Sequence, residues 1–194
     1  ERRPRQVDVA EHRTAQVGPL EALAAPIVHL LVCHDTNVRS GGVVESISKT
    51  KIGTAEASRI VDDAFGGGVR LAGMVEMTDG WFNAAYRLEL SDGRSVVLKI
   101  APPPHVEVLT YETDILRAEV AALRVVRERT TAPVPEVLWV DEARAHLPSR
   151  SFLMTFVPGE SLRHEADRIT PEARAALDRV IGRHLREIHQ IVGP

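Results

Sequence analysis

The stretch Ser95–Ile100 constrains the fold of this chain more than any other. It reads Ser-Val-Val-Leu-Lys-Ile, a run of apolar and β-branched residues with one lysine near its end. Such a run favours a strand that is buried on at least one face. An ammonium group on a buried strand needs an anionic partner, because removing an unpaired charge from water is costly. We therefore expect Lys99 to contact an anionic partner such as a carboxylate.

A helix predicted at residues 106–129 supplies a candidate carboxylate. Glu119 lies in the middle of its apolar face, one turn away from apolar residues on either side. We expect Glu119 to pair with Lys99, since two buried opposite charges satisfy each other. The alternatives are that Glu112 is the partner, or that Glu119 lies at the edge of the apolar face and is solvated. The residues that define this face are Ile115, Leu116, Ala122, Leu123 and Val126.

Other segments complete an α+β pattern. Thr54 is a candidate N-cap for a helix that Gly66-Gly67-Gly68 ends. This triplet does not predict a phosphate-binding loop, because it follows a helix and no Gly-Lys-Ser/Thr comes after it. A tight turn at Ser91-Asp92-Gly93 predicts a β-hairpin. Pro171 opens a C-terminal helix at its favoured first position. The remaining predicted strands cover residues 69–77, 84–90, 136–140 and 151–156.

Composition excludes several classes of protein. A net charge of −3 over 194 residues gives no reason to expect nucleic acid or an anionic membrane as partner. Residues 20–33 form an apolar run that Pro26 interrupts and that is too short to cross a bilayer. The single Cys33 rules out an internal disulfide framework and fits a reducing compartment, so we expect a cytoplasmic protein. Residues 1–47 show no sustained period and predict a poorly ordered N-terminal extension.

Five local patterns, in this order, resemble the aminoglycoside phosphotransferase family, bacterial enzymes that phosphorylate small molecules. The resemblance covers residues 50–194 and implies a protein-kinase-like fold. Residues 48–157 would form the small lobe, with a five-stranded antiparallel sheet, one packed helix and the hinge. Residues 158–194 would begin a helical large lobe. The patterns are Gly80-Trp81-Phe82-Asn83 with Tyr86; Val97-Leu98-Lys99-Ile100; Ala118-Glu119-Val120; Pro133-Val134-Pro135-Glu136-Val137; and Phe152-Leu153-Met154-Thr155 before Pro158-Gly159.

The resemblance implies a nucleotide site for ATP or GTP. The strand lysine of such a site contacts the α- and β-phosphates, and the helix glutamate holds it. Lys99 and Glu119 match these two positions. The loop at residues 78–83, with Gly80 and Asn83, would cover the phosphates, although it departs from the G-x-G-x-x-G of protein kinases.

Residues 154–157 would form the hinge that binds the base. By analogy with the family, the Thr155 carbonyl would accept a hydrogen bond from the exocyclic amine. The Val157 N–H would donate to the ring, and Met154 would lie behind the base. Simple core packing is the alternative interpretation of Met154, and both can hold.

The sequence lacks the residues that should complete phosphoryl transfer. In this fold a loop H-x-D-x-x-x-x-N and a later aspartate position the acceptor hydroxyl and bind Mg²⁺. The only asparagines, Asn37 and Asn83, precede the hinge, and neither Asp167 nor Asp178 has the expected context. We expect Mg²⁺ to serve the full enzyme through ligands that are not in this chain, and the chain itself to be inactive with weak or no ATP affinity.

Two functions from different classes remain open. The chain is either a fragment of an ATP-dependent phosphotransferase for a small-molecule alcohol, or a non-catalytic nucleotide-binding or interaction module. The residues that follow Pro194 would discriminate them, because an H-x-D-x-x-x-x-N loop there would establish the enzyme. An exposed apolar stripe on the C-terminal helix also indicates a larger lobe or self-association. The stripe comprises Leu177, Val180, Ile181, His184, Leu185, Ile188 and Ile191.

Overall fold

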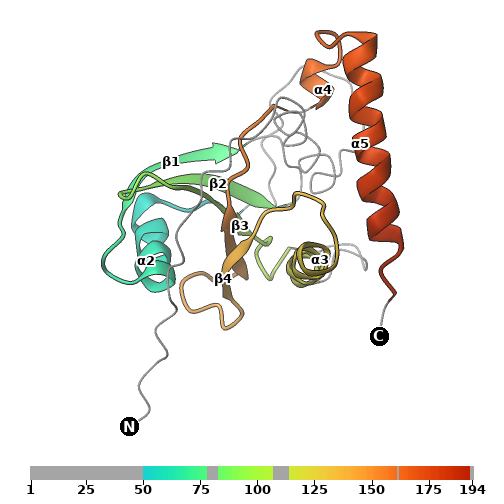
Figure 1. The fold of residues 1–194 in the computed structure, drawn as a ribbon. Helices are drawn as coiled ribbons and strands as arrows, with labels where there is room; N and C mark the ends of the chain where they lie inside the picture. The colour runs from blue at the N-terminus through green and yellow to red at the C-terminus, as the bar shows by residue number, and fades with distance from the viewer. Residues whose placement is uncertain (1–49, 78–82, 107–113, 161, 193–194) are drawn as a thin grey trace.

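The computed structural model describes residues 50–77, 83–106, 114–160 and 162–192 (Figure 1). The predicted N-terminal extension, residues 1–47, lies outside the described residues. None of the helices in the described part has the length and apolar composition needed to cross a membrane.

One antiparallel sheet of five strands organises the chain. The strands are β1 (Leu71–Met77), β2 (Ala84–Leu90), β3 (Ser95–Ile100), β4 (Val137–Asp141) and β5 (Ser151–Thr155). Their order across the sheet is β1-β2-β3-β5-β4, which places β3 in the centre. The expected five-stranded antiparallel sheet is therefore present. Only the kinase-like assignment of the lobes stays a prediction.

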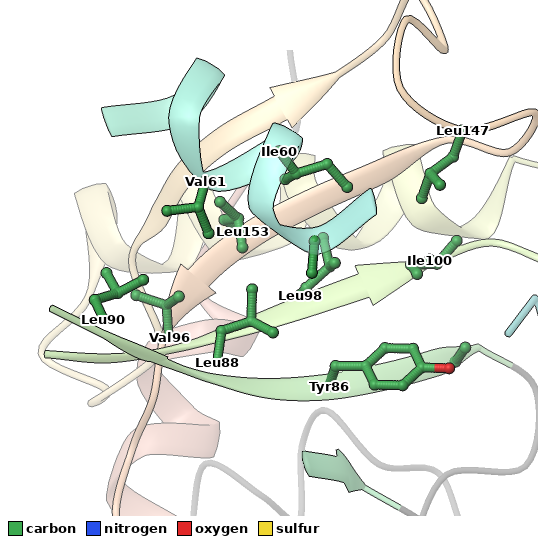
Figure 2. Close-up of a cluster of buried hydrophobic side chains, with 12 residues drawn as sticks. Ile60, Val61, Tyr86, Leu88, Leu90, Val96, Leu98, Ile100, Leu147 and Leu153 are labelled. Carbon is green, nitrogen blue, oxygen red and sulfur yellow. The ribbon is translucent and has the colours of Figure 1, made fainter. Parts of the chain in front are cut away.

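Helix α2 (Thr54–Phe65) covers one face of the sheet. Alternate residues of β2 are buried, and Leu88 and Leu98 pack with Ile60 of α2 in a fully buried core. Figure 2 shows these side chains converging between the helix and the strands. Thr54 is not the N-cap. Gly53 occupies that position, and its N–H donates to the Glu56 carboxylate over 3.0 Å.

Helix α3 (Ile115–Arg129) covers the opposite face, so helices pack on both sides of the sheet and not on one (Figure 1). The prediction that this helix begins at Val106 is wrong. The Val106 N–H donates to the Pro103 carbonyl over 3.0 Å in a turn, and α3 begins only at Ile115. Residues 107–113 lie outside the described residues. The buried positions of α3 are Leu116, Val120 and Leu123.

Two helices follow the sheet. The sequence analysis missed the one-turn helix α4 (Leu162–Glu165), which is too short for an apolar period. Helix α5 (Pro171–His189) begins at its expected proline, and the Thr170 hydroxyl accepts a hydrogen bond from the Ala173 N–H. Its apolar stripe is not fully exposed. Leu177 and His184 are buried and the remaining stripe residues are half-buried, while self-association through the stripe stays a prediction.

Candidate functional site

Lys99 occupies the central strand on the face that α3 covers. In the sheet it lies directly opposite Ala85 of β2 and Phe152 of β5. Only 9% of Lys99 is exposed. Its Nζ lies 2.5 Å from Oε1 of Glu119, whose side chain is 16% exposed. The structure thus brings together the two residues that the sequence paired, and Glu112 lies outside the described residues.

Helix α3 delivers Glu119 to this position through its own packing. Leu116, Val120 and Leu123 bury their side chains against the sheet, and Glu119 projects from the flank of that buried stripe. The sequence analysis placed Glu119 in the middle of the apolar face, with Ala122 among the apolar contacts. Ala122 is instead exposed. The buried face is centred one residue away from the expected one, because β3 and β5 and not the helix period alone select it.

Two valines lie on the same face of the sheet as the ion pair, one on each side of Arg87. Residues directly opposite each other in neighbouring antiparallel strands share a face. This register places Val97 beside Arg87 and Met154, and Val75 on the other side of Arg87. Val75 is 64% exposed. Neither valine was predicted as a site residue, although the two-residue period of β3 places Val97 on the same face as Lys99.

The expected hinge, residues 154–157, includes the last two residues of β5. Met154 is buried in the core beneath α3. Thr155 has its N–H bonded to the Glu136 carbonyl over 2.9 Å, and its hydroxyl accepts from the Glu136 N–H. The guanidinium of Arg87 stacks 4.3 Å from the centre of the Phe156 ring. Val157 is half-buried, and none of the described residues accepts a hydrogen bond from its N–H.

Of the loop expected to cover the phosphates, residues 78–83, only Asn83 lies within the described residues. Gly80 lies outside the described residues. Asn83 precedes β2, and its buried Oδ1 has no hydrogen-bond partner among the described residues. Four other buried polar side-chain atoms of the described residues share this property, so it does not by itself mark a ligand site. Within the described ranges, no group of three or more His, Cys, Asp or Glu side chains could hold a metal ion.

Comparison with protein families gives one finding. Residues 74–194, more than half of the chain, match the model described as the Phosphotransferase enzyme family. The match begins in β1 and includes Lys99, Glu119 and the hinge. No curated protein sequence matches the chain. The resemblance that the five sequence patterns indicated is therefore confirmed.

Proposed function

This chain belongs to the phosphotransferase enzyme family, and we propose that it carries the nucleotide-binding lobe of an ATP-dependent phosphotransferase acting on a small-molecule hydroxyl. The ion pair between Lys99 and Glu119 is the observation that carries this proposal. A structural ion pair would serve the fold equally well in any part of the sheet. This one lies on the central strand of the sheet, and the Val157 N–H at the end of the expected hinge has no acceptor among the described residues.

Lys99 would bind the phosphates of the nucleotide. An ammonium group carries three N–H donors, and Glu119 accepts from one of them. The remaining donors are available to phosphate oxygens. Because the carboxylate fixes the direction of the side chain, the ammonium is oriented before the nucleotide binds. Its orientation therefore does not have to be selected from many rotamers during binding.

The base would lie against Val75 and reach the hinge with its polar edge. Adenine is flat and apolar on its faces, and its edge carries one amine donor and ring nitrogen acceptors. The Val157 N–H would donate to the ring, and the Thr155 carbonyl would accept from the amine. GTP is the alternative nucleotide, and its edge reverses this pattern of donor and acceptor.

Mg²⁺, when bound, would neutralise charge on the phosphates. The described residues offer no metal cluster, so they do not by themselves fit this ion, and the proposal assigns it no step. The acceptor is proposed only as a small-molecule alcohol, an aminoglycoside or a similar antibiotic or metabolite. We also propose that the chain is cytoplasmic.

A non-catalytic nucleotide-binding module is the second candidate function. The residues that support nucleotide binding support it equally, because this chain shows no H-x-D-x-x-x-x-N motif that would favour the enzyme. Both candidates predict nucleotide binding, and only the enzyme predicts transfer. We expect no phosphate transfer by this chain. Turnover with any aminoglycoside in a coupled ADP-release assay would contradict that expectation.

Nucleotide binding can be tested directly at Lys99, because the chain has only three lysines, Lys49, Lys51 and Lys99. Labelling lysine with ¹³C at Cε gives three NMR signals, and Lys99→Met identifies one of them by its loss. We expect ATP to move the Lys99 signal in a saturable manner at about millimolar concentration, a binding free energy of about −4 kcal/mol, because the described residues include no metal cluster that would hold Mg²⁺ against the phosphates. Adenosine, which has no phosphates, should move it much less.

The other two lysines serve as internal references. A Lys99 signal that does not respond to saturating ATP, ADP or GTP would overturn the proposed site. Equal responses of all three lysines would also contradict it, since they would indicate non-specific binding of a polyanion.

A further inference from the structure

Glu187 of α5 accepts hydrogen bonds from Thr131, just beyond the C-terminal end of α3. Its Oε2 accepts a hydrogen bond from the Thr131 N–H over 2.7 Å, and its Oε1 accepts one from the Thr131 hydroxyl over 2.9 Å. Thr131 lies two residues beyond the end of α3, whereas Glu187 is in the last turns of α5. Hydrogen bonds from these two donors hold the pKa of Glu187 below its ordinary value. The carboxylate is therefore charged at neutral pH, and its hydrogen bonds are of the stronger, charge-assisted kind.

A second contact joins the same two helix ends. Arg129 donates to the Val192 carbonyl over 3.1 Å, and Ile188 packs against the core beneath α3. Thr130 connects Thr131 to the last turn of α3, because its N–H and its hydroxyl both donate to the Val126 carbonyl. The C-terminal end of α3 is therefore attached to α5 through side chains on both sides.

The opposite end of α3 is attached to the sheet. Asp114, immediately before the helix, forms an ion pair with Arg150, which lies next to the first residue of β5. Glu119 is located between these two attachments. A helix transmits displacement along its axis, and a shift by one residue corresponds to about 1.5 Å. Such a shift would break a contact as short as that between Glu119 and Lys99.

We propose that Glu187 is a positioning residue: by binding Thr131 it restrains α3 in the axial position that its core packing gives it, and so helps to hold Glu119 against Lys99. This inference rests on the proposed nucleotide site and extends it to a residue of α5 that does not touch the site. It gives α5 a role in orienting the Lys99 ammonium group before phosphate binds. The contact between Lys99 and Glu119 thereby depends on α5, which follows the sheet in the chain.

The Lys99 NMR signal tests this inference in the full 194-residue chain. In Glu187→Gln, the neutral amide weakens both hydrogen bonds, and we expect the Lys99 signal to move toward its position in Glu119→Gln. We also expect ADP to bind about fivefold more weakly, within the range of effects that distant coupled residues produce. Glu172→Gln removes the same charge from the exposed first turn of α5 and should change neither quantity.

A conservative substitution separates positioning from a merely structural role. Thr131→Ser retains both donors and should leave the Lys99 signal in place, whereas Thr131→Val loses the hydroxyl and should move it part of the way. General destabilisation would not move a signal of the folded state. Amide exchange of α3 supplies a second readout, and we expect it to be faster in Glu187→Gln at residues 126–131.

The outcomes also separate this inference from the proposed function. If ADP does not bind to the wild-type chain, the proposed function fails, while the displacement of the Lys99 signal in Glu187→Gln still tests the positioning. If ADP binds and Glu187→Gln alters neither the Lys99 signal nor the affinity, the positioning role is wrong. If Glu187→Gln prevents folding, Thr131→Val gives the same test with a smaller change.

Discussion

The pair of Lys99 and Glu119 permits a sharp prediction about stability, because both side chains are nearly buried and each is the other's partner. Three variants form a double-mutant cycle: Lys99→Met, Glu119→Leu, and both together. Methionine and leucine keep much of the volume of the original side chains and remove only the charge. Each single variant leaves one charge in an apolar environment, and the double variant leaves none.

The expected magnitude follows from the burial of the two groups. Removing one partner of a fully buried pair costs about 3–5 kcal/mol. The side chains here are 11% and 16% exposed, and some contact with water remains. We therefore expect each single variant to lose about 2–3 kcal/mol, at or just below the lower limit of that range. The double variant should lie within about 1 kcal/mol of the wild type, because an apolar pair of similar volume replaces a buried ion pair at little cost.

Unfolding in urea, followed by tryptophan fluorescence, measures the four free energies of unfolding. Glu128→Gln is the matched control, an exposed carboxylate on the same helix, and should change stability by less than about 0.5 kcal/mol. If the two single losses simply add in the double variant, with a coupling below about 0.5 kcal/mol, the two charges do not depend on each other. The reasoning from burial would then be refuted.

Two further predictions concern the core and the end of α3. Leu98→Ala removes a fully buried side chain from between α2 and the sheet and should lower the free energy of unfolding by about 3 kcal/mol, measured by thermal or urea unfolding. Val75→Thr, at an exposed position of β1, is the control and should lower it by less than about 0.5 kcal/mol. Equal losses of stability in the two variants would contradict the assigned core. The folded pKa of Glu187 lies below the ordinary value of 4.5, through hydrogen bonds from Thr131 and the nearby charges of His184 and Arg183. The stability advantage of the wild type over Glu187→Gln should therefore be complete above about pH 4.5 and shrink as the pH falls below it, and a constant difference down to pH 2.5 would show that the Thr131 contacts contribute nothing.

The strands were predictable where the sequence carries a local signal. The limits expected for β2 and β3 are those of the structure, because alternation and the turn at Gly93 define both ends. Gly93 has a φ of 84°, which glycine adopts without strain. Caps were less predictable. Thr54 has the preferred side chain for an N-cap, yet Gly53 takes this position because the Glu56 carboxylate satisfies its N–H.

The candidate site likewise contains residues that the sequence predicted and residues that only the structure identifies. Lys99 and Glu119 were identified from the sequence because an isolated charge in an apolar pattern requires a partner. Val75 was not identified, since its importance depends on the register of β1 against β2 and on lying on the same face as Lys99. Glu187 was also missed. A glutamate near the end of an amphipathic helix is ordinary in sequence, and only the approach of α5 to α3 gives it a role.

The sequence by itself determined that the charge of Lys99 had to be compensated, because the penalty for an unpaired buried charge depends on chemistry and burial alone. It also determined the family, through short motifs in a fixed order. Only the tertiary structure decided which carboxylate compensates that charge and what holds it in place. The choice depends on where α3 lies along its axis, and contacts between residues far apart in the chain set that position.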